Sequence, residues 1–180
     1  MSILKVARMG HPVLRRRARE VEAAELREPS IQTFIDDMID TMHEYHGVGL
    51  AAPQVHEALR LFVAFLDART PPDDDEVERE PEAIVVVNPE ITVVDGTVIE
   101  DWEGCLSIPD IRGRVPRARE IHVRALDRDG SRFDLRASDF PARVIQHETD
   151  HLDGVLFFDR MRSLESLTFL EEYSRFQKAD

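Results

Sequence analysis

The chain has 180 residues, 42% of them hydrophobic and 33% charged, which fits a single domain over residues 1–180 with a sizeable core. No apolar run approaches the ~18 residues of a membrane span, and charge interrupts the N-terminal segment too early for a secretory signal. We therefore expect a cytoplasmic protein without a membrane partner. The net charge of −13 argues against direct DNA binding or bulk RNA binding, but does not exclude local docking on a ribonucleoprotein.

The first predicted element is a helix that begins after a cap at Ser30 and ends at Gly47. Apolar residues recur at helical spacing between these two positions. His43 and His46 fall in its last turns, where a cation suits the helix dipole. A structural role for these two histidines is therefore favoured over a chemical one.

A glycine-rich segment, GVGLAAPQ at residues 47–54, follows this helix and has two interpretations. It matches the G-x-G-x-x-A pattern of dinucleotide-binding folds, and Asp67 follows at a fitting distance. That fold needs a preceding strand and a helix opening inside the motif, whereas the preceding segment is helical and Pro53 would interrupt the new helix. We favour a tight loop that brings backbone close to a ligand, with Gln54 as a donor for an oxyanion; a plain helix-to-strand connection stays open.

Short apolar runs typical of strands come next, at residues 61–66, 84–87 and 91–94. Asp95-Gly96 lies between β-branched runs and predicts a hairpin. A second hairpin is predicted around Asp129-Gly130, between IHVRAL and RFDLR. The middle of the chain should therefore consist of antiparallel strands.

Residues 67–82 read DARTPPDDDEVEREPE, an acidic stretch with three prolines. This composition is too polar to bury and too rich in proline for a sheet interior. We predict an acidic surface loop here.

A second helix is predicted from near Ser138 or Asp139 to Gly154, and a short strand, VLFF, at residues 155–158. The tail from Ser163 predicts a last helix with three leucines facing inward: Leu164, Leu167 and Leu170. Helix, antiparallel strands, helix, strand and helix make an α+β pattern rather than alternating βαβ units.

The second helix carries the sequence His147-Glu148-Thr149-Asp150-His151, an H-E-x-x-H motif. Residues four apart on a helix have Cβ atoms about 5–6 Å apart, so His147 and His151 can bind one metal ion. Glu148 follows Ile145 by three residues and falls on the buried stripe, where desolvation raises a carboxyl pKa toward the range of a general base. The alternative is an ordinary helix that happens to carry these residues.

A catalytic metal site usually needs a third protein ligand and an open position. The extended peptidase motif would place a histidine at position 157, but this residue is Phe157, and no histidine follows His151 in the sequence. The candidate lies upstream, at Cys105 in EGCLS, because a thiolate and two imidazoles form a reasonable tetrahedral site with one vacancy. The pentapeptide alone is equally compatible with a buried structural cysteine.

In order, GVGLAAPQ, EGCLS and QHETDHLDG resemble the three signature segments of the peptide deformylase family, at about the family's spacing. The similarity extends from HPVLRRRA near the N-terminus through VLFF and so covers nearly the whole chain. It implies an α+β fold with antiparallel sheets around a central helix that carries H-E-x-x-H, and with helices toward both termini.

The resemblance implies a metal-dependent hydrolase that removes the N-formyl group from the initiator N-formylmethionine of nascent polypeptides and releases formate. Cys105, His147 and His151 would bind one divalent metal ion. Ferrous iron is common in the family, while zinc, nickel and cobalt also suit these ligands. Glu148 would act as general base toward the metal-bound water, and then as general acid toward the leaving amine.

The resemblance also implies roles for residues around the metal. The Gln54 amide and the backbone N–H of Leu106 would stabilise the oxyanion. The N-formylmethionyl peptide would pair as an added strand beside Gly49, with Val48 in the methionine pocket. Arg143 departs from the apolar residue common near that pocket.

Two alternatives and one partner stay open. A zinc-type peptidase would use the same helix without requiring Cys105, and a non-enzymatic binding module would require neither Glu148 nor Gln54. Some deformylases are thought to dock on ribosomes through a basic tail, which LEEYSRFQKAD lacks, so a transient ribosome association is left undecided.

Overall fold

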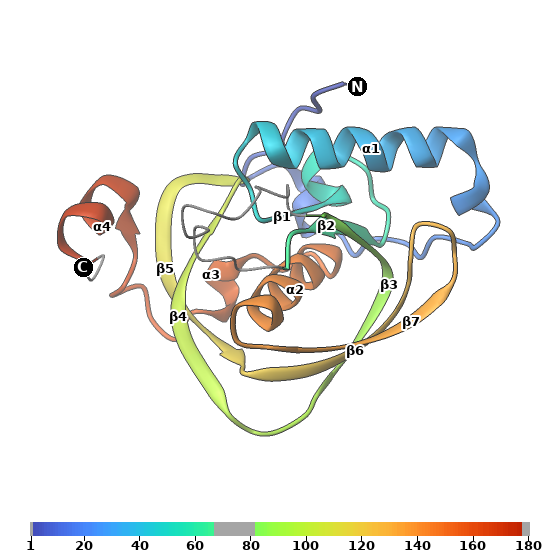
Figure 1. Cartoon of the computed structure of the whole chain (residues 1–180). Coiled ribbons are helices and arrows are strands. Elements are labelled where there is room, and N and C mark those ends of the chain that lie inside the picture. The colour runs from blue at the N-terminus through green and yellow to red at the C-terminus, as the bar shows by residue number, and fades with distance from the viewer. Residues whose placement is uncertain (1, 67–81, 178–180) are drawn as a thin grey trace, which may run out of the picture.

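The computed structural model describes residues 2–66 and 82–177 and is a mixed α+β fold with two antiparallel sheets (Figure 1). One sheet has the strand order β1-β2-β3-β6-β7, and the other has the order β4-β5-β8. The strands are β1 (Gly49–Ala51), β2 (Leu61–Ala64), β3 (Ile84–Val93), β4 (Val98–Cys105), β5 (Ile108–Ala118), β6 (Glu120–Leu126), β7 (Arg132–Ser138) and β8 (Thr168–Phe169). The helices are α1 (Pro29–Glu44), α2 (Asp139–Leu152), α3 (Phe157–Arg160) and α4 (Leu170–Phe176), with 3₁₀ turns at Pro12–Arg15, Glu25–Arg27 and Ala52–Val55.

Helix α2 lies in the space that the strands enclose, and it packs against strands of both sheets (Figure 1). Most of its residues are buried, including the polar ones in its second half. Its apolar side chains Val144 and Ile145 join a core cluster with Phe62 of β2 and Ile121 of β6. Because sheets surround this helix on several sides, its polar residues from His147 to His151 are buried. The predicted fold class, a mixed α+β fold with antiparallel sheets and helices, is confirmed.

Helix α1 covers the outer face of β1 and β2, and both of its predicted ends need correction. The helix begins at Pro29 rather than after a Ser30 cap, because the fixed φ of proline suits the first helical turn. It ends at Glu44, and His46 rather than Gly47 adopts the left-handed conformation, with φ of 51°. His43 remains in the last turn, as predicted.

The two predicted hairpins have different outcomes. β6 and β7 form the hairpin expected around Asp129-Gly130, with Glu120 opposite Ser138. The prediction of a hairpin at Asp95-Gly96 is wrong, because β3 pairs with β6 and β4 pairs with β5. The chain passes from one sheet into the other here, curving below α2 (Figure 1). Turn residues favour a reversal, but the partner of each strand is set by residues far along the chain.

The segment after α2 also differs from the prediction. The prediction of a strand at VLFF is wrong, since Phe157–Arg160 forms the short helix α3. The Leu156 N–H donates to Asp159 Oδ2 at 2.7 Å, and Phe157 is buried, so a local cap and one apolar anchor stabilise this turn.

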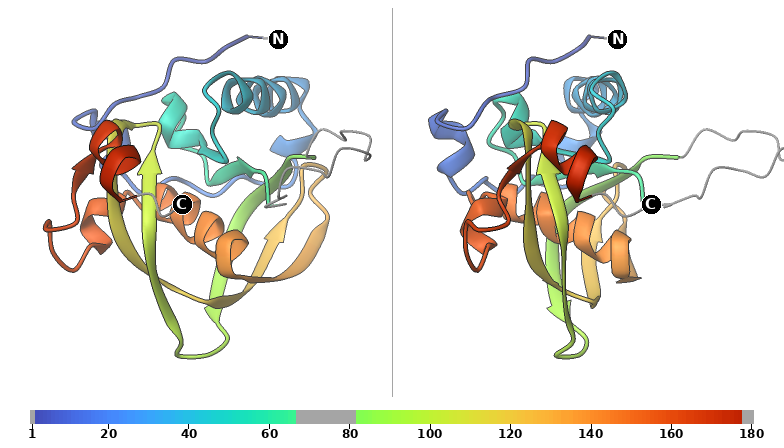
Figure 2. Two further views of the ribbon diagram at one scale, coloured as in Figure 1. Left: turned by 60° about the vertical axis from the view of Figure 1, so that its left-hand side comes forward. Right: turned by 90° about the vertical axis from the view of Figure 1, so that its left-hand side faces the viewer.

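The C-terminal helix is shorter than expected. It begins at Leu170 rather than Ser163, and both Leu164 and Leu167 are exposed rather than inward. Thr168 instead pairs with Arg112 of β5, which places α4 beside β4 and β5 in both views of Figure 2.

Two expectations concern the surface of the chain. The acidic loop predicted at residues 67–82 falls, except for Glu82, outside the described residues. Within the described parts of the chain, the helices are all too short or too polar to cross a membrane.

Candidate active site

Three segments that are distant in the sequence meet at one cavity of about 680 Å³. The first is the connection from α1 through β1 to the following 3₁₀ turn, the second is the end of β4, and the third is α2. The cavity is lined by seven of the eight site residues expected from the sequence: Val48, Gly49, Gln54, Cys105, Leu106, His147 and Glu148. The eighth, His151, lies behind this lining and is almost fully buried.

Cys105, His147 and His151 form a candidate metal site. One ligand atom from each lies within 4.8 Å of the others, and all three side chains are buried. The Sγ atom of Cys105 is 3.2 Å from Nε2 of His151. Spacing of four residues on α2 brings the two imidazoles to 5.0 Å between ring centroids. One thiolate and two imidazoles are a donor set that suits a divalent transition metal with an open coordination position.

The charges in this cluster also suit a cation. Burial would raise the pKa of the Cys105 thiol, but the neighbouring His151 and the hydrogen bonds from both imidazoles hold that pKa well below its usual range. Burial would lower the pKa of His147, but hydrogen bonds to Cys105 and Glu103 raise it well above its ordinary value. Both shifts favour the charged forms, a thiolate at Cys105 and an imidazolium at His147. The negative charges that retain this proton equally favour a metal ion in its place.

Glu148 lies against the β1 backbone with one carboxylate oxygen unsatisfied. Burial raises the pKa of Glu148 to about 7, although the imidazoles of His147 and His151 oppose this rise. Among the groups that the structure describes, Oε2 of Glu148 has no hydrogen-bond partner. A buried, unpaired carboxylate costs free energy, which is typical of a functional group held ready for a ligand.

The position of Glu148 depends on the missing side chain of Gly49. A Cβ atom added at Gly49 would lie 2.4 Å from Oε1 of Glu148, well inside van der Waals contact. We therefore expect Gly49→Ala to displace the carboxylate and to lower kcat by about 100-fold, the effect of a ~1 Å misplacement of a reacting group. Metal content, measured on the purified protein, should stay unchanged. Gly96→Ala is the matched control, because a Cβ there meets nothing within 4 Å; equal activity of both variants would contradict the expectation.

The Gln54 side chain is fixed by a hydrogen bond to the backbone at the start of its own 3₁₀ turn. Its Oε1 accepts a hydrogen bond from the Ala51 N–H at 2.8 Å, and its Nε2 lies 3.4 Å from Cys105 Sγ and 3.3 Å from Ser107 Oγ. The fixed oxygen therefore directs the amide N–H₂ group toward the end of β4, beside the candidate metal ligands.

The residues expected to contact a peptide lie at a sheet edge. β1 is the first strand of its sheet, so one side of the Gly49 backbone is not paired with a neighbouring strand of that sheet. Val48 is 49% exposed at the cavity, and the Leu106 side chain packs against Gly47. This edge has the form that β-strand addition requires.

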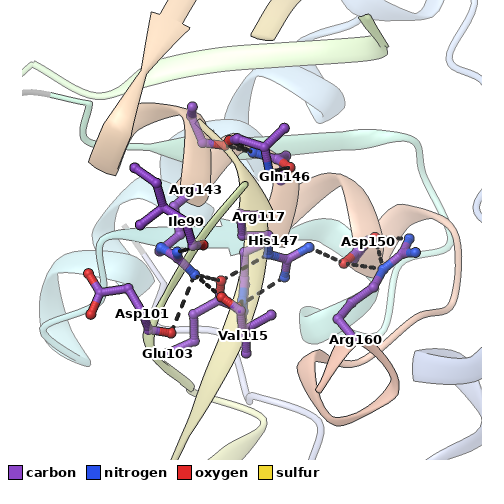
Figure 3. A network of polar contacts seen from close by, with 12 residues as sticks. Ile99, Asp101, Glu103, Val115, Arg117, Arg143, Gln146, His147, Asp150 and Arg160 are labelled. Carbon is purple, nitrogen blue, oxygen red and sulfur yellow. Dashed lines mark hydrogen bonds and ion pairs between the residues drawn. The ribbon is translucent and has the colours of Figure 1, made fainter. Parts of the chain in front are cut away.

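The sequence interpretation missed Glu103, which carries a buried polar network behind the cavity (Figure 3). Its Oε2 accepts a hydrogen bond from Nδ1 of His147 at 2.8 Å, and its carboxylate also accepts two from Arg117, at 2.9 and 3.0 Å. Burial would raise the pKa of Glu103, but His147 and Arg117 hold it well below the usual range. Because Nδ1 of His147 is engaged, its Nε2 is left to bind a metal. A usable signal was the period of two along the strand, since Glu103 and Cys105 are both buried and Gly104 between them is less so.

Comparison with known proteins identifies the family. A family model described as polypeptide deformylase matches residues 3–167. Peptide deformylase 2 of Nostoc sp. is 43% identical over 171 residues, covering 95% of this chain and 93% of the relative. Peptide deformylase of Thermus thermophilus is 45% identical over 177 residues, covering 94% and 90%.

Solved structures agree with the sequence relatives. A class I type b peptide deformylase from Acinetobacter baumannii superposes with a TM-score of 0.81 at 38% identity, covering 89% of this chain and all of that one. A structure of the same enzyme bound to Met-Ala-Ser superposes with a TM-score of 0.78 at 39% identity, covering 89% and 99%. The earlier resemblance is therefore confirmed, and the chain belongs to the polypeptide deformylase family.

Proposed function

We propose that this chain hydrolyses the N-formyl group of N-formylmethionyl peptides and releases formate, with the residues of the candidate site in the roles given below. As a deformylase it is a hydrolase acting on a linear amide. The observation that carries the assignment of residues is the convergence of Cys105, His147 and His151 beside the unpaired carboxylate of Glu148.

Cys105 and the two histidines hold the metal ion. When bound, a divalent cation in such a site lowers the pKa of coordinated water toward neutrality and polarises a carbonyl oxygen. The buried thiolate and the Glu103–His147 hydrogen bond favour tight retention of the ion. We propose ferrous iron as the native metal; zinc, nickel and cobalt are alternatives that the ligand types also fit.

Glu148 moves the protons. It accepts a proton from the water that attacks the formyl carbon, and it returns a proton to the amine nitrogen as the carbon–nitrogen bond breaks. Its Oε2 has no competing partner among the described residues, and burial raises its pKa, which favours proton acceptance. The products are formate and a peptide with a free N-terminus.

Gln54, Leu106 and β1 place the substrate. The Gln54 amide and the Leu106 backbone N–H donate to the oxygen on which negative charge develops. The peptide backbone pairs with Gly49 at the edge of its sheet, and the methionine side chain lies by Val48. The Acinetobacter baumannii relative binds Met-Ala-Ser, which supports a short peptide as the ligand. Main-chain pairing makes few demands on the later side chains of the substrate.

The cellular assignments follow from this substrate. N-formylmethionyl chains arise during translation, so we propose that the protein acts in the cytoplasm as a single catalytic domain over residues 1–180. Any contact with the ribosome is transient in this proposal, because the strongly acidic chain has little charge to attract RNA.

Metal removal tests the proposal. Protein purified anaerobically should contain about one divalent metal ion per chain and release formate from a formyl-methionyl peptide. Treatment with a chelator should abolish formate release, because a metal-activated nucleophile is lost. Adding back Fe²⁺ or Ni²⁺ should restore it. Full activity in the metal-free protein, or cleavage of internal peptide bonds in place of formate release, would refute the assignment.

A further inference from the structure

Arg143 lies on α2 one turn before His147, and its side chain reaches across to β4 and β5 (Figure 3). Its Nη1 donates to Glu103 Oε1 and to the Val115 carbonyl, each at 2.8 Å, and its Nη2 donates to the Ile99 carbonyl at 2.8 Å. A single guanidinium thus ties the central helix to β4, which carries Cys105, and to the neighbouring strand β5. The rigid fork of arginine allows these bonds to form together, which a lysine ammonium would not reproduce.

Glu103 connects this guanidinium to the metal site. The carboxylate is 4% exposed and is shared by three donors, Arg143, Arg117 and His147. Removing one partner of a buried ion pair leaves the other charge under-compensated, and the remaining groups rearrange. Loss of Arg143 should therefore disturb the oxygen atoms that orient the His147 ring.

These contacts also show how an arginine can replace the apolar residue that is common near the methionine pocket. Arg143 borders the cavity beside Val144, where a free positive charge would oppose an apolar side chain. Its charge is instead compensated by Glu103 and by strand carbonyls. The methylene stem of such a side chain behaves as apolar surface, while its head group stays in a polar environment.

We propose that Arg143 is a positioning residue for His147: it fixes Glu103 so that this carboxylate holds the His147 ring in the ligating orientation, and it leaves the preference for methionine unchanged. This inference rests on the proposed function, because it needs His147 to be a metal ligand. An oriented outer carboxylate strengthens a histidine ligand, and its loss typically weakens metal binding by ~10- to 100-fold.

A double-mutant cycle tests the proposal with four proteins: wild type, Arg143→Met, Glu103→Gln and the double variant. Methionine keeps an unbranched apolar stem and removes every donor. Each protein is loaded with Co²⁺ and titrated with a competing chelator, while the absorption of the cobalt–thiolate site reports occupancy. We expect Arg143→Met to weaken Co²⁺ binding by ~10-fold or more. In the Glu103→Gln background the same substitution should have no further effect, because the residue through which it acts is already altered.

Two controls accompany the cycle: the selectivity between formyl-methionyl and formyl-leucyl peptides, and the substitution of an exposed arginine. At saturating metal, the ratio of kcat/KM for formyl-methionyl and formyl-leucyl peptides should be the same in Arg143→Met and wild type. Arg124→Met removes an exposed arginine that pairs only with exposed Glu90 in the described structure, and its Co²⁺ affinity should equal that of wild type. If Arg143→Met does not fold, Arg143→Lys replaces it in the cycle, with a smaller loss expected.

Three results overturn the proposal: unchanged Co²⁺ affinity in the folded Arg143 variant, a loss of the same size with and without Glu103, or altered selectivity with intact affinity. Failure of the proposed function is recognised separately. In that case wild type itself binds no Co²⁺ or releases no formate, before any variant is compared.

Discussion

Replacing Glu148 by glutamine should lower kcat for formate release by ~10²- to 10⁴-fold, the usual contribution of a general acid–base group. Glutamine has nearly the same shape, but it cannot accept a proton from water. The metal ligands are untouched, so metal content should remain near one ion per chain and KM should change little. Initial rates of formate release at saturating metal, with metal analysis of the same sample, measure both quantities.

Glu57→Gln is the matched control for this substitution, because Glu57 is exposed and lies outside the cavity lining. It should keep wild-type kcat. A Glu148→Gln protein as active as wild type would return the non-enzymatic or differently catalysed alternatives to consideration, since no proton transfer would then depend on this carboxyl group.

Replacing Cys105 by alanine should remove both metal and activity. The thiolate is the one ligand that does not come from α2, so only two imidazoles of the described ligand set would remain. Loss of a direct ligand should weaken metal binding by more than the ~10- to 100-fold that an outer partner contributes. Metal content after anaerobic purification and formate release on the same sample are the measurements.

This substitution separates a deformylase from a zinc-type peptidase, which uses the same helix without a cysteine ligand. The variant should unfold at the temperature of chelator-treated wild type, because both lack the stabilisation that a bound ion gives the folded state. A Cys105→Ala protein that retains its metal and its activity would show that the ion is held by a different set of residues.

The sequence by itself determined the features that depend on near neighbours. Helical periodicity placed α2, and the four-residue spacing of His147 and His151 set their rings side by side before any fold was known. Turn chemistry placed the β6–β7 hairpin, whose strands are joined by only a few residues. The ordered signature segments were sufficient to indicate the family, and the eight site residues they named lie at or directly behind one cavity.

Only the tertiary structure decided how distant segments pair. Asp95-Gly96 has the local chemistry of a hairpin, yet β3 and β4 belong to different sheets. Likewise VLFF has strand-forming residues, but a cap from Asp159 and burial of Phe157 start the short helix α3 at its second half. The strand propensity of a short segment does not determine its structure where packing against the rest of the molecule contributes more to stability.

The network behind the metal site depends most on the tertiary structure. Glu103 meets Arg117, 14 residues away, and Arg143, 40 residues away, in one buried cluster. The sequence contains these charges but not their distances, which follow from the β4–β5 register and from the packing of α2 against strands of both sheets. Periodicity and capping act over about one helical turn, whereas ion pairing requires that non-local strands are already in place.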